Sequence, residues 1–261
     1  MKKMIALLLA LVMIAACFAG CAPKTNENSD LAYVQEKGKL LVGITDYEPM
    51  DYKDADGNWI GFDADVAKLF AEELGVECEF IVLTDWSKKF YELNTKNIDV
   101  IWNGMTITDE AKSNASVSDP YVINAQVLVT EADVADQYKN ADAIKDLAVA
   151  VENGSAGQDA ATAAGVTNIV AVGDQTGALL EVAGNTSDAC VVDITLAKAT
   201  TGEGKTYPDL AIAQNLTEEE YGVAFRTGSD ITAKLNAFFD KLAADGKLQE
   251  LADKYGVTLV D

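Results

Sequence analysis

Short runs of β-branched and other apolar residues alternate with segments of helical periodicity along most of this chain. Residues 62–74 show the helical pattern clearly, because Val66, Leu69 and Phe70 fall on one stripe and Gly75 follows as a stop signal. We expect strands at residues 40–44, 78–83, 100–102, 126–130, 147–151, 168–172, 189–192 and 221–225. Strands that alternate with helices form mainly parallel sheets with helices on both faces, so the expected fold class is α/β.

This alternation falls into two series, residues 40–130 and 147–200. Two series of this length suggest two modest lobes. The strand expected at 221–225 and the helical segment 230–255 can return to the first lobe, so that the chain crosses between the lobes twice. Two crossings make a hinge about which the lobes can close on a ligand.

The N-terminus has the pattern of an export signal. An apolar run at residues 5–16 follows Lys2 and Lys3. It is too short to span a bilayer and suits the core of a signal peptide, which we place at residues 1–20. With this signal we expect the protein to leave the cytoplasm. No other apolar run approaches the ~20 residues that a transmembrane helix needs.

Cys21 is the expected site of lipidation. It follows the small pair Ala19-Gly20 after the apolar run, which resembles a bacterial lipobox. Cys17 is a second candidate, but more apolar chain follows it, whereas a polar stretch follows Cys21. We expect residues 21–36 to form a flexible, lipid-anchored tether at the outer face of the cell membrane.

Composition excludes several classes of function. The chain has 20 basic and 42 acidic residues, a formal net charge of −22, which argues against nucleic acid or anionic lipid as a surface partner. It contains no His, which removes Ser-His-Asp and Cys-His catalysis and the commonest zinc ligand. Cys78 and Cys190 lie far apart in apolar segments, so we expect buried free thiols.

Seven short blocks carry a family resemblance. In this order and spacing they resemble the polar amino-acid solute-binding proteins of ABC importers, the bacterial extracellular solute-binding proteins of family 3. The blocks are 43–54, 61–65, 85–86, 97–100, 103–108, 118–121 and 221–225. The resemblance covers about residues 37 to 256.

The resemblance implies a type II periplasmic-binding-protein fold with two lobes joined by a two-strand hinge. Lobe 1 would comprise residues 37–126 and 225–261, and lobe 2 residues 127–224. The implied protein is a monomer that captures an amino acid by lobe closure and delivers it to an ABC permease. It needs no metal or cofactor and is not an enzyme.

The resemblance also implies roles for eight residues. Asp193 would bind the ligand's α-ammonium, unless it only caps the helix that begins near Ile194. Tyr47 and Trp86 would flank the ligand, although packing between lobes is the usual fate of such side chains.

Donors to the ligand's carboxylate would come from two strand ends. In the first lobe, Asn103, Gly104 and Thr106 could donate from backbone amides and a hydroxyl, or simply form a strand-to-helix turn. In the second lobe, the amides of Ser155 and Ala156 could bind a carboxylate at a helix N-terminus, or simply start that helix.

One departure from the family pattern leaves a question open. Ala111 stands where the family carries an Arg that holds the ligand's α-carboxylate, and the chain's only Arg is Arg226. Lys112, Lys88, or Thr106 together with the 155–156 amides are alternative donors. Glu152 would favour a ligand with a second positive group, such as a basic amino acid.

Two other functions fit the same scaffold. An exported dehydratase of the cyclohexadienyl dehydratase type would need a general acid in the cleft, for which Glu152 and Asp193 are candidates. A sensor that reports the ligand to a membrane partner without transport would use the same closed lobes.

Overall fold

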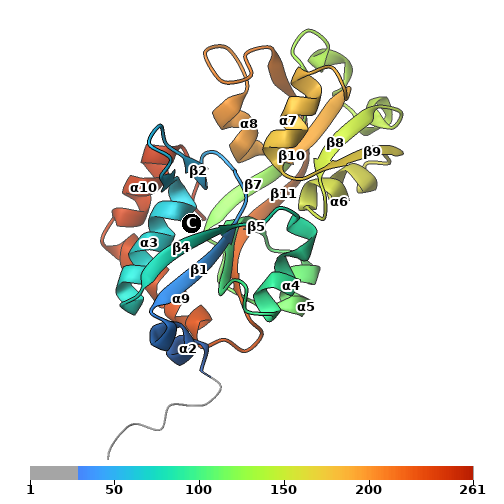
Figure 1. The fold of residues 1–261 in the computed structure, drawn as a ribbon. Helices are drawn as coiled ribbons and strands as arrows, with labels where there is room; N and C mark the ends of the chain where they lie inside the picture. The colour runs from blue at the N-terminus through green and yellow to red at the C-terminus, as the bar shows by residue number, and fades with distance from the viewer. Residues whose placement is uncertain (1–28, 261) are drawn as a thin grey trace, which may run out of the picture.

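The computed structural model describes residues 29–260, which form two lobes joined by two long strands (Figure 1). The helices are α2 (Asp30–Lys37), α3 (Phe62–Leu74), α4 (Lys89–Asn94), α5 (Asp109–Asn114), α6 (Ala156–Ala163), α7 (Gln175–Ala183), α8 (Ile194–Thr200), α9 (Ile231–Ala244) and α10 (Lys247–Tyr255). Short 3-10 helices are η1 (Trp86–Lys88), η2 (Ala135–Gln137) and η3 (Ala141–Ile144). The strands are β1 (Lys39–Ile44), β2 (Tyr52–Lys53), β3 (Trp59–Ile60), β4 (Glu77–Val82), β5 (Val100–Thr106), β6 (Ser116–Val117), β7 (Val122–Glu131), β8 (Ala148–Glu152), β9 (Asn168–Val172), β10 (Ala189–Asp193) and β11 (Leu210–Phe225).

One continuous sheet runs through the molecule in the order β4-β1-β5-β11-β7-β10-β8-β9. Strands β4, β1 and β5 pair in parallel in lobe 1, and β10, β8 and β9 pair in parallel in lobe 2. Between these sets, β7 and β11 pair antiparallel over their length, with two irregularities in register. The expected α/β fold, with two lobes and a two-strand hinge, is therefore confirmed.

Lobe 1 as drawn in the lower part of Figure 1 holds α2 to α5 and the C-terminal helices α9 and α10, whereas α6, α7 and α8 lie in lobe 2. An aromatic cluster links the C-terminal α9 to the first lobe: Phe239 packs against Trp102 and Tyr121, and Phe238 against Phe70. The chain thus returns to lobe 1, as expected, and its last helices pack against that lobe. The exact lobe boundaries, at 126/127 and 224/225, fall inside β7 and β11 and stay a proposal.

Two elements differ from the sequence-based expectation. Strand β11 begins at Leu210 rather than at 221. The sequence did not predict the stretch 210–220 as a strand, because it alternates irregularly and includes Glu218, Glu219 and Glu220, a run that resembles an exposed loop. Helix α2 occupies part of the predicted tether, so that prediction was wrong from residue 30 onward.

Helix α2 forms because both of its ends are capped and a buried charge holds it. Ser29 accepts a hydrogen bond from the amide of Ala32, and Gly38 ends the helix with a φ of 74°. Asp30 accepts from the guanidinium of Arg226, which also contacts Asp99. Arg226 therefore ties the helix to lobe 1 and does not line the cavity described below.

Three further predictions concern the cysteines, membrane-spanning helices and the N-terminal signal. Cys78 and Cys190 are free, as expected, and lie in opposite lobes, but only Cys190 is buried and Cys78 is partly exposed. None of the helices within residues 29–260 is both long and apolar enough to cross a membrane. The signal peptide, Cys17 and the lipidation site Cys21 lie outside the described residues.

Candidate functional site

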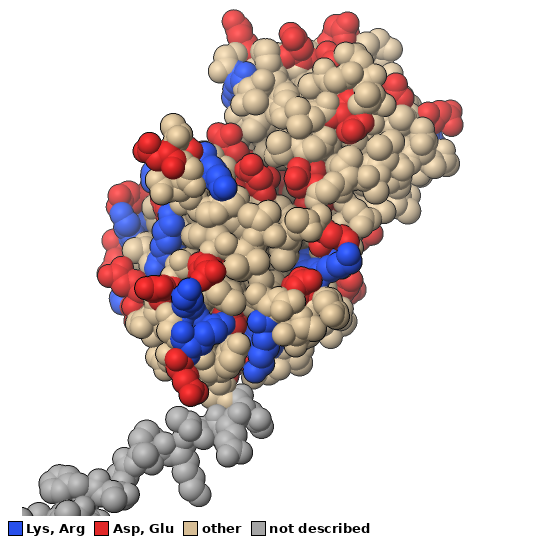
Figure 2. All heavy atoms as spheres, viewed as in Figure 1, with Lys and Arg blue, Asp and Glu red and all other residues tan. Residues whose placement is uncertain are grey.

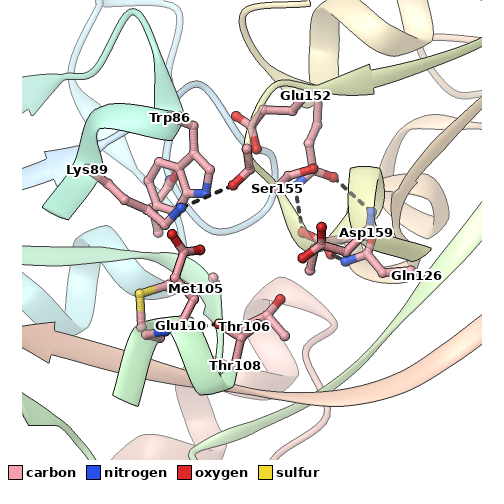
Figure 3. Close-up of a pocket in the computed structure, with 17 residues that line it drawn as sticks. Trp86, Lys89, Met105, Thr106, Thr108, Glu110, Gln126, Glu152, Ser155 and Asp159 are labelled. Atoms are coloured by element: carbon pink, nitrogen blue, oxygen red, sulfur yellow. Dashed lines mark hydrogen bonds between the residues drawn. The ribbon is translucent and has the colours of Figure 1, made fainter. Parts of the chain in front are cut away.

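A cavity lies between the two lobes, where the carboxyl ends of β5, β8 and β10 face one another (Figure 3). Ligands of open α/β sheets bind at such strand ends. The lining residues are Trp86, Lys89, Asn103, Gly104, Met105, Thr106, Thr108, Glu110, Ala111, Gln126, Glu152, Gly154, Ser155, Ala156, Asp159, Gln175 and Asp193. Seven of the eight residues predicted for the site line it, and Tyr47 is the exception.

The two lobes are in direct contact through hydrogen bonds. The Lys89 ammonium of lobe 1 donates to the carbonyl of Gly154 in lobe 2 at 3.1 Å. The Thr176 hydroxyl of lobe 2 donates to the carbonyl of Asp46 in lobe 1 at 3.3 Å. Gly154 has a φ of 73°, and a Cβ placed there would lie 2.6 Å from the Cβ of Ser87. This close approach leaves room only for glycine.

Asp193 lies at the end of β10 with 2% of its surface exposed. Its Oδ1 accepts from the side-chain amides of Asn124 and Gln126, and its Oδ2 accepts from Gln175 at 2.6 Å. Burial raises the pKa of Asp193, and these amides counteract the shift. Asp193 also lines the cavity, so an ammonium group of a bound ligand can approach this carboxylate.

Asp193 occupies the N-cap position of α8, as the alternative expected, but its side chain does not cap the helix. Its side chain makes no capping hydrogen bond to α8, because the amides of β7 and α7 hold it in another direction.

A second carboxylate shares these amides. Glu219 on β11 accepts from Asn124 at 2.7 Å, from Gln126 at 2.8 Å and from the Thr106 hydroxyl at 2.9 Å. Burial, then the charge of Asp193, raise its pKa to about 7. The Thr106 hydroxyl therefore donates its hydrogen bond to a protein carboxylate and not, as we expected, to a ligand.

The donors predicted at Asn103 and Gly104 are also engaged within the protein. Asn103 donates to Asp51 at 2.8 Å and accepts from the amide of Thr45 at 2.9 Å. The amide of Gly104 donates to Asp63 at 2.6 Å. Both residues line the cavity, but the Gly104 amide, predicted to donate to a ligand, donates to Asp63 instead.

The two predicted aromatic residues have different surroundings. Trp86 lines the cavity beside Lys89. Tyr47 is buried below the floor, where its hydroxyl contacts the hydroxyl of Tyr221, and a Cβ at Gly104 would lie 2.6 Å from its ring. Tyr47 therefore packs inside the protein in this structure and does not line the cavity.

Ser155 and Ala156 lie at the N-terminus of α6. The Ser155 hydroxyl accepts from the amide of Gln158 at 3.2 Å and caps the helix. Ala156 is the first residue of α6, so its amide has no acceptor within the helix, and the residue lines the cavity. This segment therefore begins α6 and also lines the cavity.

Glu152 at the end of β8 lines the cavity with 3% of its surface exposed, and its Oε1 has no hydrogen-bond partner within the described chain. Burial, then the charges of Asp193 and Asp174, raise its pKa well above the ordinary value. An unpaired buried carboxyl group is costly for a folded protein.

Lys89 is the lining cation that the sequence reasoning missed. Lys88, one of the proposed donors, is exposed and paired with Asp85, and Lys112 is exposed on α5. Ala111 lies in the cavity wall with its small side chain. The adjacent pair Lys88-Lys89 gave no signal in the sequence to show which member points inward.

The lining charges are strongly unequal. Glu110, Glu152, Asp159 and Asp193 face one lysine, Lys89. Figure 2 shows most basic side chains of the visible face on the lower lobe. Over residues 127–224 the sequence has 4 basic and 16 acidic residues, so 4 − 16 gives −12. This excess creates a negative potential around the cavity, which attracts cations.

A cavity between two α/β lobes that are joined by two strands defines a two-lobe solute-binding protein. A family model described as bacterial extracellular solute-binding proteins, family 3, matches residues 40–258, and this chain belongs to that family. The family expected from the seven sequence blocks is thus confirmed.

Named relatives are similar over nearly their full length. The L-cystine-binding protein TcyJ of Escherichia coli K12 is 31% identical, over 94% of this chain and 92% of its own. The arginine-binding extracellular protein ArtP of Bacillus subtilis is 29% identical, over 98% of each chain. A solved structure of a mutant of arginine-bound ArgBP from T. maritima is 34% identical, with a TM-score of 0.75, over 81% of this chain and 99% of that chain.

Gly154→Ala tests whether the lobe contact supports ligand binding. We expect affinity for the amino acid that the wild type binds to fall at least about tenfold, which corresponds to ~1.4 kcal/mol of lost closure energy. Gly204→Ala is the matched control, because Gly204 has a similar φ of 78° in lobe 2 and no atom within 4 Å of a new Cβ. Calorimetry measures both variants. Equal affinities in both would show that the contact at Ser87 is not needed for closure.

Proposed function

We propose that this protein is the extracytoplasmic binding component of an ABC importer and captures a cationic amino acid, such as arginine, lysine or ornithine, by lobe closure. The observation that carries the proposal is the buried carboxyl group of Glu152, which lines the cavity with one oxygen unpaired. A cationic side chain of the ligand would pair with that oxygen and remove the cost of burying it alone.

A second acidic residue of the cavity, Asp193, suits the α-ammonium of such a ligand. Asp193 lines the cavity and its carboxylate is held by three side-chain amides, so it would bind the α-ammonium. The pairing of Asp193 with the α-ammonium leaves Glu152 for a second positive group. An ordinary neutral amino acid would bring no partner for it.

Several features support this choice over the alternatives. The acidic excess of residues 127–224 favours cations, and ArtP and ArgBP carry arginine in their names or bound state. Capture without chemical conversion is part of the proposal, since the named relatives are binding proteins. The lobe boundaries given above, the monomeric state, the permease partner and the lipid anchor at Cys21 belong to the same proposal.

Glu152→Gln tests the role of this carboxyl group directly. We expect L-arginine to bind the wild type at least about tenfold more tightly than L-glutamine, since a charge-assisted hydrogen bond is worth ~1.5–3 kcal/mol. The variant should lose most of this preference while it keeps its thermal stability. Calorimetry with a panel of amino acids measures the preference, and product analysis of the arginine samples checks that the ligand is unchanged.

Asp146→Asn is the control, because it removes one negative charge from the exposed surface of lobe 2. It should leave the preference for arginine intact. Tight binding of glutamate or aspartate, with no binding of arginine, lysine or ornithine, would overturn the proposed ligand class.

The pH dependence of binding provides a second test. The raised pKa of Glu152 lets the free protein hold a proton there above pH 4.5, and a bound cation lowers that pKa. The complex then binds fewer protons than the free protein, so affinity for L-arginine should rise as pH increases from about 5 to 7.5. Asp193 and Glu219, whose pKa values are also raised, shift binding in the same direction.

Calorimetry at pH 6 in buffers of different ionisation enthalpy measures the protons released on binding. The wild type should release protons, and Glu152→Gln should release fewer. Proton uptake by the wild type, or a fall in affinity as pH rises through this range, would contradict the account.

A further inference from the structure

Lys89 is a buried cation that has carboxylates in its surroundings but no ion-pair partner at close range within the described residues. Lys89 is the first residue of α4, and 6% of its surface is exposed. Its ammonium lies 5.2 Å from the ring centroid of Trp86 and 5.0 Å from that of Phe90. No carboxylate oxygen of residues 29–260 lies within 4.0 Å of it, although Lys88 beside it is paired at 3.0 Å.

The hydrogen-bonding capacity of this ammonium is only partly used. It carries three N–H donors, and its recorded acceptor is the carbonyl of Gly154. Burial lowers the pKa of Lys89, whereas the surrounding carboxylates Glu110, Glu152 and Asp159 raise it. A buried ammonium with spare donors that faces a ligand cavity is suited to an anionic group of the ligand.

The neighbouring groups converge on the same place. Gly154, which accepts from Lys89, directly precedes Ser155 and Ala156 at the N-terminus of α6. The free amide of Ala156 and the positive end of the helix therefore lie beside the ammonium. Ala111 contributes only a methyl group to the lining, and no second cation lines the cavity within the described chain.

We infer that Lys89 holds the carboxylate of the bound amino acid, together with the Ala156 amide at the N-terminus of α6. The inference rests on the proposed function, because it needs an amino acid in the cavity. The residue comes from lobe 1 and the helix from lobe 2, so the carboxylate would join the two lobes. Lys89 thus determines that the ligand is an amino acid rather than the amine that lacks its carboxyl group.

Paired ligands test this assignment. Agmatine is arginine without the carboxylate, so the ratio of the two affinities reports on the carboxylate contact alone. We expect the wild type to prefer L-arginine at least about tenfold, and Lys89→Met to reduce that preference to about threefold or less, mainly by weaker arginine binding. Lys88→Met, which removes the adjacent exposed charge, should keep the wild-type ratio. Calorimetry with both ligands measures all three proteins.

A second variant, Lys89→Gln, guards against a folding defect, and circular dichroism checks each protein. Equal binding of arginine and agmatine by the wild type overturns the inference without any variant. An unchanged ratio in Lys89→Met, or tighter arginine binding by that variant, also overturns it and shows that Lys89 only balances the acidic lining. In those cases the proposed function stands. If the wild type binds no cationic amino acid, the proposed function fails and the inference fails with it.

Discussion

The backbone ladder between β7 and β11 is the interaction on which the rest of the molecule depends. These strands pair from Val122 with Tyr221 to Glu131 with Leu210, and they join the sheet of lobe 1 to that of lobe 2. Because the sheet is continuous, the carboxyl ends of β5, β8 and β10 face a common space. The two irregularities in the ladder lie between Ile212 and Thr217, within the stretch that connects the lobes. β-Bulges of this kind bend strands locally, which suits a hinge.

The same two strands carry the polar side chains that organise the site. Asn124 and Gln126 lie two residues apart on β7, so they point to the same face of the sheet and hold both Asp193 and Glu219. Two carboxylates bridged by two amides lie at the junction of the lobes, with raised pKa values. The hinge therefore holds negative charge next to the cavity, and a cationic ligand would offset the cost of bringing these groups together.

Much of the fold could be predicted because its signals are local. The apolar stripe and the stop at Gly75 predicted α3 at its observed bounds, and β9 was also predicted to the residue. The first half of β11 could not, because its pattern is set by pairing with β7 rather than by its own hydrophobic alternation. Helix α2 was missed because its stability comes from the distant Arg226 as well as from its caps.

The site was predicted by position more successfully than by chemistry. Most of the expected residues line the cavity, but the amide of Gly104 and the hydroxyl of Thr106 donate to Asp63 and Glu219, which no local pattern reveals. Glu219 was hidden in a run of three glutamates, and Lys89 in a pair of lysines. In each case the fold selects one inward member from neighbours of the same type, and a sequence alone does not show which.

A crystal structure of the protein with bound L-arginine would test the central claim most directly, because it shows where each charged end of the ligand lies. The account predicts the guanidinium within hydrogen-bonding distance of Glu152, the α-ammonium at Asp193 and the carboxylate between Lys89 and the N-terminus of α6. A complex in which the guanidinium pairs elsewhere and Oε1 of Glu152 stays without a partner would contradict it.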